Sequence, residues 1–284
     1  MLEFNIFHLM PWSGAYAIYF FVIGIAAAMF FFSALSWYRP EFQTIRTQSF
    51  NISFILLAAG GLLLIGDLTQ PLRFLNIMNP AYLNFSSPLA WGGLNLISFG
   101  IVSILYFLVM RKNDEGNSRK LAVVGALLAL GLPIYTGFDL TVHQNRPVWN
   151  TPLMPVLFVA LSLLSGAAVA TFIAKGEKLL VMLRRFMLWS AGAVAAMLVS
   201  LLGTTAYGGS GSELTFMFMT SGSLGAIFVG LGILAGTVAP IAVLLTNSGK
   251  QQGGMMLAGA LLLVGGMALR YSILISGQIV QTYY

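Results

Sequence analysis

Residues 135–152 have the sequence YTGFDLTVHQNRPVWNTP, and they end a long apolar segment with charged and hydrogen-bonding side chains. A carboxylate at the centre of a bilayer costs about 2.5 to 3.5 kcal/mol on insertion scales, so Asp139 in a spanning segment has to be interfacial, paired or protonated. A similar polar stretch, DLTQPLR at 67–73, follows an earlier apolar run. We interpret the two stretches as parts of one polar cap.

Composition places the chain among integral membrane proteins. Of its 284 residues, 58% are hydrophobic and only 8% are charged, and the mean hydropathy is +0.88. Soluble domains carry about 25% charged residues and could not bury so much apolar surface. The Lys and Arg residues behind the formal charge of +6 fall mostly in short loops between spans. Their placement therefore indicates membrane topology and not nucleic-acid binding.

Eight segments are long and apolar enough to span a bilayer as helices. They cover about 15–37, 51–67, 89–110, 121–140, 152–174, 186–205, 222–245 and 254–276. The first is too long for a signal peptide and lacks a basic segment before it, so we expect no cleavage. We expect one membrane domain of two four-helix bundles, 1–150 and 151–284, in which the small-residue runs at 60–61, 166–168 and 230–236 allow close packing.

Eleven of the fourteen Lys and Arg residues fall in loops on one side of the predicted bundle. They are Arg39, Arg46, Arg111, Lys112, Arg119, Lys120, Lys175, Lys178, Arg184, Arg185 and Lys250. The other side carries Arg73 and Arg146, while Arg270 lies within the last span. Since cytoplasmic loops are enriched in Lys and Arg, we expect both termini and both polar stretches on the outer side.

The outer loops, 68–88 and 141–152, are longer than the charged loops and rich in Pro, Asn, Ser and Trp. Their turn-rich, nearly uncharged character favours a surface on which a partner protein docks. The alternative is that their aromatic residues form the outer interfacial belt of a membrane protein. Trp149, within NRPVWN, fits that alternative least.

Polar side chains within the spans are the strongest indication of function, because lipid offers them no partner. Tyr16 and Tyr19 share a face of the first span, and Asp67 ends the second. Three further residues lie at the outer end of the fourth span: Tyr135, Thr136 and Asp139. Together these residues could line a quinone pocket, with hydroxyls bonding the ring oxygens and a carboxylate accepting a proton. The alternative is ordinary interfacial tyrosines and helix-capping aspartates.

Arg270 cannot lose its charge, so we expect it to pair with Asp67 or Asp139, either structurally or in proton movement. The protein has no cysteine and so cannot ligate an iron–sulfur cluster. Its two histidines, His8 and His143, lie in or beside outer loops and not at facing positions within spans. We therefore expect no haem or metal in this chain, and a partner has to exchange the electrons.

Several motifs resemble those of the polysulfide reductase membrane-anchor family, the NrfD/PsrC type. They are AIYFF at 17–21, SPLAWG at 87–92, NRPVWN at 145–150, and Arg270 followed by SGQ at 276–278. The likeness covers nearly the whole chain, and its SPxxWG and RPxWN pieces are fairly specific together. In the family pattern the first span presents Asn and His to the quinone, where this chain has Tyr16 and Tyr19.

The resemblance implies eight helices in a bacterial inner membrane and a quinone site, here for menaquinone, within the first four. Tyr135 resembles the family's quinone-contacting tyrosine, and Asp67 falls where an acidic group is usual. The implied partners are a four-cluster iron–sulfur subunit and a molybdopterin enzyme, docked on periplasmic loops 68–88 and 141–152. The protein itself would exchange electrons with the quinone pool and leave the terminal substrate to another subunit.

Two other interpretations remain open. Eight spans with intramembrane Asp and Arg also suit a proton-coupled secondary transporter, although such a site should lie near the bilayer midplane, whereas Asp67 and Asp139 lie near the outer end. The protein could also be an anchor that holds partner subunits without any quinone chemistry.

Overall fold

The computed structural model describes residues 12–67, 71–72, 76 and 79–279, apart from the side chains of Asp67 and Pro80. Within these ranges every regular element is helical and no strand occurs. Eight helical segments of the described chain are long and apolar enough to cross a membrane. The predicted fold class, an all-α membrane protein with eight spans, is confirmed.

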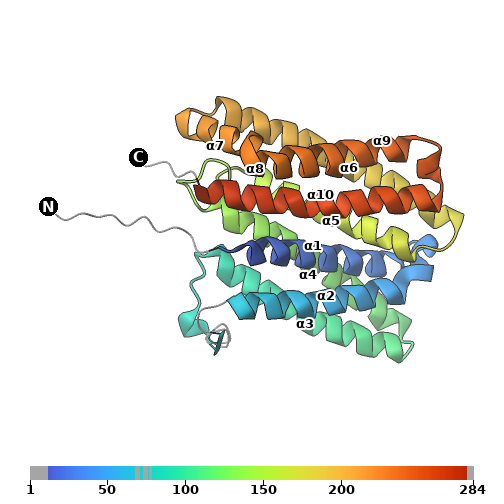
Figure 1. The fold of residues 1–284 in the computed structure, drawn as a ribbon. Coiled ribbons are helices and arrows are strands. Elements are labelled where there is room, and N and C mark those ends of the chain that lie inside the picture. The colour runs from blue at the N-terminus through green and yellow to red at the C-terminus, as the bar shows by residue number, and fades with distance from the viewer. Residues whose placement is uncertain (1–11, 68–70, 73–75, 77–78, 280–284) are drawn as a thin grey trace.

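The spans alternate in direction along one bundle (Figure 1). They are α1 (Gly14–Leu35), α2 (Arg46–Asp67), α3 (Pro88–Arg111), α4 (Glu115–Thr141), α5 (Leu153–Ile173), α6 (Glu177–Tyr207), a composite seventh span, and α10 (Gln252–Ile279). The seventh span joins α8 (Gly222–Gly225), a π-helix labelled η4 (Ala226–Val238) and α9 (Ala239–Leu245). Shorter elements are η1 (Pro40–Ile45), η3 (Pro80–Tyr82), α7 (Ser210–Thr220) and η5 (Ser248–Lys250).

Local sequence explains where several spans begin. Ser13 caps α1 by accepting a hydrogen bond from the Ala15 N–H at 3.2 Å. Asp114 caps α4 in the same way, and its bonds from the backbone and side chain of Asn117 hold the pKa of its carboxyl below the usual range. Pro88 occupies the first position of α3, where its missing N–H costs nothing.

Helix α1 is the centre of the bundle. It packs against α2 and α4 on one side and against α5 and α10 on the other, and its described residues are mostly buried. Helix α3 contacts mainly α4 and exposes much of its surface. Because α1 is packed on both groups of helices, the division of the chain near residue 150 stays a prediction.

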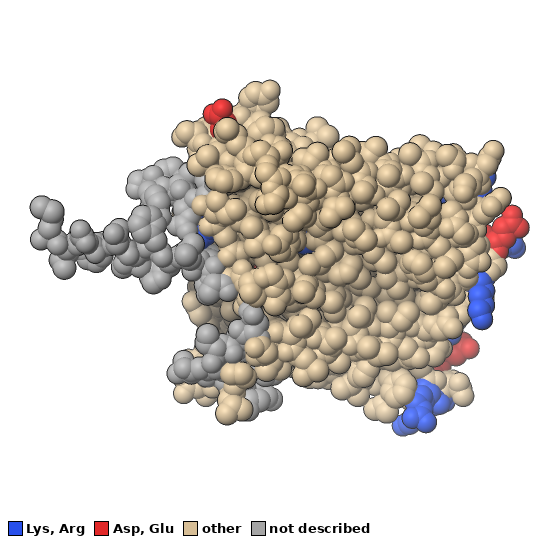
Figure 2. Space-filling model, in the orientation of Figure 1, with Lys and Arg blue, Asp and Glu red and all other residues tan. Residues whose placement is uncertain are grey.

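Charged side chains gather at one end of the bundle (Figure 2). This is the end at which α1, α3, α5 and α9 finish, so it carries the loops that supply the eleven cations of the sequence pattern. The start of α1 and the end of α10 lie at the opposite end, together with loop 141–152 and the described residues 79–87 of the loop before α3 (Figure 1). The assignment of that opposite end to the periplasm stays a prediction.

Candidate functional site

The last turns of α4 place Tyr135, Thr136 and Asp139 inside the bundle. All three side chains are buried, so none of them faces lipid. Pro133 contributes no backbone N–H to the helix, and the Thr136 hydroxyl donates to the Pro133 carbonyl at 3.0 Å. The Thr136 hydroxyl is thus used within its own helix, while Tyr135 and Asp139 present their polar atoms to neighbouring elements.

Four predicted site residues meet where α1 faces α4. The Tyr19 hydroxyl interacts with that of Tyr135, and Tyr16 and Asp139 are the other electrostatic neighbours of this pair. The two hydroxyls do not have the geometry of a regular hydrogen bond, so the buried Tyr19 Oη keeps unused bonding capacity. Asp67 ends α2, a neighbour of α1, and its side chain lies outside the described residues.

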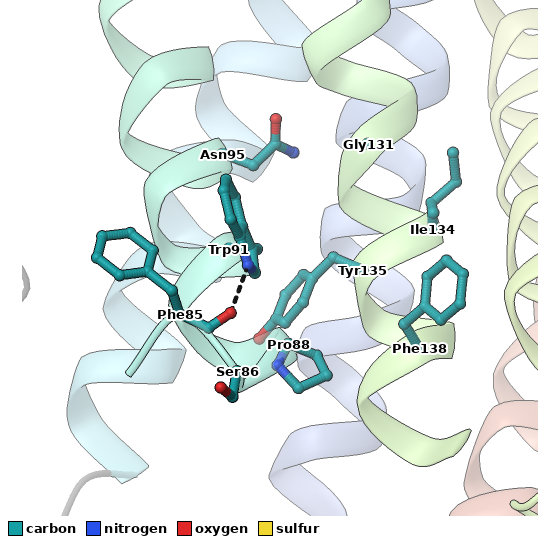
Figure 3. A pocket seen from close by; sticks show the side chains of 9 residues that line it. All are labelled: Phe85, Ser86, Pro88, Trp91, Asn95, Gly131, Ile134, Tyr135 and Phe138. Atoms are coloured by element: carbon teal, nitrogen blue, oxygen red, sulfur yellow. Dashed lines mark hydrogen bonds between the residues drawn. The ribbon is translucent and has the colours of Figure 1, made fainter. Parts of the chain in front are cut away.

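A cleft of about 460 Å³ opens between α3 and α4, on the side of Tyr135 away from α1. Figure 3 shows Tyr135 reaching from α4 across the cleft toward the start of α3. The full lining is Phe85, Ser86, Pro88, Trp91, Asn95, Gly131, Ile134, Tyr135 and Phe138. Tyr16, Tyr19, Thr136 and Asp139 do not line it, so Tyr135 is the predicted residue that connects the cleft with the buried cluster.

The mouth of the cleft is apolar and lies on the lipid-facing surface of the bundle. Trp91 is 59% exposed and Phe138 is 50% exposed, as expected for side chains at an opening to the acyl chains. The Trp91 indole donates to the Phe85 carbonyl at 2.9 Å, which fixes one wall. Such a cleft suits a ligand with an apolar tail and a small polar head.

Two glycines shape this cleft in a way that the sequence pattern did not reveal. A Cβ added at Gly92 of α3 would overlap the Tyr135 ring, so this glycine lets the phenol lie flat against α3. A Cβ at Gly131 of α4 would come within 2.8 Å of the Asn95 amide, which donates to the Leu128 carbonyl at 2.9 Å. Gly92 lies in the SPLAWG motif, so this motif was the feature of the sequence that pointed to the cleft.

Arg270 does not pair with Asp139, one of its two expected partners, and the side chain of the other, Asp67, lies outside the described residues. Arg270 is fully buried, and its guanidinium donates to the Gly266 carbonyl at 3.0 Å and to Ser162 Oγ at 3.1 Å. Phe21 and Phe158 lie 5.5 and 5.9 Å from the guanidinium carbon. Arg270 points to the junction of α1, α5 and α10 instead of the α4 site, and no ion pair of Arg270 occurs within the described residues.

Loop 141–152 is held firmly to the last span. The Trp149 indole is fully buried and donates to the Ile273 carbonyl at 2.8 Å, and Arg146 donates to the Gly277 carbonyl. Trp12, from the start of the described chain, stacks on both Trp149 and Tyr16 with ring centroids 5.3 and 5.4 Å apart. Trp149 is thus a core residue and not part of an interfacial belt. This agrees with its place in the NRPVWN motif, which fitted an interfacial belt least.

The described residues contain no group of His, Asp and Glu side chains that could hold a metal ion. Of the two histidines in the sequence, His8 lies outside the described residues.

Fold and site together define a multi-pass helical membrane protein with a tyrosine and carboxylate cluster beside a lipid-facing cleft at one end of its bundle. The chain belongs to the family described as polysulphide reductase, NrfD, whose model matches residues 3–281. The family resemblance of the sequence motifs is confirmed.

Curated relatives agree with this membership. The sequence is 28% identical to one of the chains of the polysulfide reductase of Wolinella succinogenes, over 96% of both proteins. It is 33% identical to one of the subunits of the tetrathionate reductase of Salmonella typhimurium, over 52% of this chain and 44% of that protein. It is 27% identical to protein NrfD of Escherichia coli, over 60% of this chain and 62% of that protein.

Proposed function

We propose that this protein is the quinone-reactive membrane anchor of a reductase complex. The observation that carries the proposal is Tyr135, which lines the lipid-facing cleft and also has Tyr16, Tyr19 and Asp139 as its electrostatic neighbours. Membership of the polysulphide reductase family supports the assignment to a reductase complex. The relatives that belong to polysulfide and tetrathionate reductases support it as well.

The residues present fit a quinone. The cleft is large enough for a ring, its mouth is apolar as an isoprenoid tail requires, and the buried Tyr19 Oη has unused hydrogen-bonding capacity nearby. A bound quinol supplies electrons and protons when it is oxidised, and the ring type we favour is menaquinone. The Tyr135 hydroxyl would donate to a ring oxygen, with Tyr19 and Tyr16 orienting that phenol, and the Asp139 carboxylate would hold the released proton. Roles for Asp67, Thr136 and Arg270 stay predictions.

We further propose that electrons pass to an iron–sulfur subunit docked on loops 68–88 and 141–152, with a molybdopterin enzyme behind it in a bacterial inner membrane. The anchoring of loop 141–152 through Trp149 and Arg146 supports this, because a docking surface has to hold its shape. Nearly uncharged outer loops would bury against a partner without stranding charges.

The test is Tyr135→Phe in the assembled complex. Removal of the hydroxyl leaves the ring packed on Gly92, so assembly should persist while quinol-dependent turnover falls about tenfold, the effect of losing roughly 1.4 kcal/mol of hydrogen bonding. Tyr38→Phe is the control, since Tyr38 is 56% exposed in the loop after α1, at the opposite end. Unchanged turnover, together with no quinone in extracts of the purified complex, would leave the protein as an anchor without quinone chemistry. Loss of solute uptake in Asp139→Asn, with quinol oxidation intact, would support a transporter.

A further inference from the structure

A second cleft, of about 340 Å³, lies at the charged end of the bundle, where α6 and α10 begin (Figure 1). We call it the basic cleft, and its lining combines charged and apolar residues: Gly176, Glu177, Leu180, Val181, Arg184, Lys250 and Met255. Pockets of about 300 to 1,000 Å³ commonly hold small ligands. No residue of the basic cleft lines the cleft beside Tyr135, so the two sites are separate.

Contacts between several elements hold the walls of the basic cleft. Arg184 Nε donates to the Leu244 carbonyl at 2.8 Å, which joins α6 to the last turn of α9. The Gln252 side chain donates to the Ala174 carbonyl at 3.3 Å, which joins the start of α10 to the loop after α5. A Cβ at Gly249 would overlap the backbone of Leu244, so this glycine lets η5 fold back onto α9. The shape of the cleft is thus set by the protein itself.

The two cations of the basic cleft keep hydrogen-bond donors that no described residue uses. Arg184 donates to the protein only through Nε, so its two Nη groups are available. Lys250 Nζ donates to Asn247 Oδ1 at 3.0 Å, and the rest of its ammonium donors are available as well. Within the part of the chain that the structure describes, no ion pair involves Arg184, Lys250 or Glu177. Two cations and one carboxylate leave the lining net positive, which favours an anionic ligand.

The basic cleft lies at the depth of the lipid headgroups. Helix α6 has 31 residues, so at a rise of about 1.5 Å per residue it is about 46 Å long, whereas the hydrocarbon core is about 30 Å thick. Its apolar window, predicted at 186–205, excludes Glu177 and Arg184. Val181, one turn after the start of the helix, is 44% exposed and apolar, as expected where acyl chains begin. A lipid could therefore reach the cleft with its headgroup while its chains stay in the bilayer.

We propose that the basic cleft binds the headgroup of an anionic phospholipid from the leaflet at the charged end of the bundle. The phosphate oxygens accept hydrogen bonds from the Nη groups of Arg184 and from the ammonium of Lys250, and the lipid chain leaves the cleft over Val181. A zwitterionic lipid carries an ammonium that the two cations repel, so the lining selects a headgroup with a net negative charge. This inference does not depend on the proposed quinol oxidation.

Titration of the full-length protein with phosphatidylglycerol, followed by native mass spectrometry from detergent, tests this proposal. Arg184→Gln and Lys250→Gln should each weaken binding about fivefold, the effect expected for one cation near a membrane surface. Glu177→Gln removes a repelling carboxylate and should tighten binding. Lys112→Gln removes an exposed cation at the same end but outside the basic cleft, so this matched control should bind like the wild type. Unchanged binding in both cation variants, or weaker binding in Glu177→Gln, would overturn the proposal.

A second measurement separates a lipid from a free anion. Phosphatidylglycerol should raise the unfolding temperature of the protein in detergent, because a ligand that binds the folded state stabilises it. The increase should shrink in Lys250→Gln, an exposed residue whose replacement leaves the bond from Arg184 to Leu244 intact, and also at high salt, which screens charges. Phosphatidylethanolamine and inorganic phosphate at the same concentration should stabilise the wild type less. Equal stabilisation by inorganic phosphate would identify a free-anion site, and equal stabilisation by phosphatidylethanolamine would remove the selection by charge; either result overturns the assignment to an anionic lipid.

Discussion

At the scale of single residues, the most unusual side chain is Arg270. A fully buried guanidinium normally needs a carboxylate partner, but here the described neighbours are a serine hydroxyl, a backbone carbonyl and two phenylalanine rings, and its Nε has no hydrogen-bond partner. Ser162 Oγ donates to the Phe158 carbonyl at 2.7 Å while it accepts from Arg270. This hydroxyl therefore joins α5 to α10 at the point where both meet α1.

Gly24 makes room for that junction, which leads to a stability prediction. A Cβ at Gly24 would overlap Ser162 Oγ and come within 3.0 Å of Arg270 Nη2. We expect Gly24→Ala to destabilise the protein by about 1 to 3 kcal/mol, through overpacking and a weakened hydrogen bond of a buried charge. The measurement is thermal unfolding of the purified protein in detergent. Gly61→Ala is the control, because nothing lies within 4 Å of its added Cβ, and alanine is the better helix former by about 1 kcal/mol. Equal unfolding temperatures for the two variants would contradict the prediction.

The sequence identified the residue types of the site more reliably than their partners. Tyr16, Tyr19, Tyr135 and Asp139 were predicted to share one level of the bundle, and they meet where α1 faces α4, because depth along a helix follows from residue number. Arg270 does not meet Asp139, because the direction in which α10 turns this side chain depends on packing against α5, and the pairing with Asp67 stays a prediction. The cage of Trp12, His143 and Trp149 was not predicted either, since its contacts join residues far apart in the chain.

At the scale of elements, hydropathy predicted every span but not its full length or its helix type. Helix α6 begins at Glu177 and not near residue 186, because its first turns carry Lys178, Arg184 and Arg185 and an apolar window excludes them. Helix α7 was not predicted, since it is too short to span a membrane. The π-helical part of the seventh span left no trace in hydropathy, because its residues are as apolar as those of an α-helix.

The π-helix η4 packs closely against α10, and this contact gives an element-scale prediction. A Cβ at Gly236 would overlap the backbone of Gly265, and a Cβ at Gly265 would overlap Gly236 in return. Gly236→Ala should push the two helices apart and lower the unfolding temperature in detergent, with a cost of about 1 to 3 kcal/mol. Gly230→Ala lies in the same π-helix with nothing within 4 Å of its added Cβ, so it should have little effect. A similar loss of thermal stability in both variants would mean that the glycines are needed for the π-helical conformation of η4 and not for its contact with α10.

At the scale of the whole molecule, the charge pattern makes a prediction about orientation. The sequence has no cysteine, so a single introduced cysteine is a clean reporter of which side of the membrane a loop faces. Asn150 is exposed in loop 141–152, and Gln251 is exposed at the charged end between η5 and α10. By the positive-inside rule, a membrane-impermeant maleimide should label Asn150→Cys in intact spheroplasts and Gln251→Cys only after the membrane is opened. Both substitutions leave the number of Lys and Arg residues unchanged. The opposite labelling pattern would place the tyrosine cluster and the cleft beside Tyr135 on the cytoplasmic side, and the proposed docking of an iron–sulfur subunit in the periplasm would have to be given up.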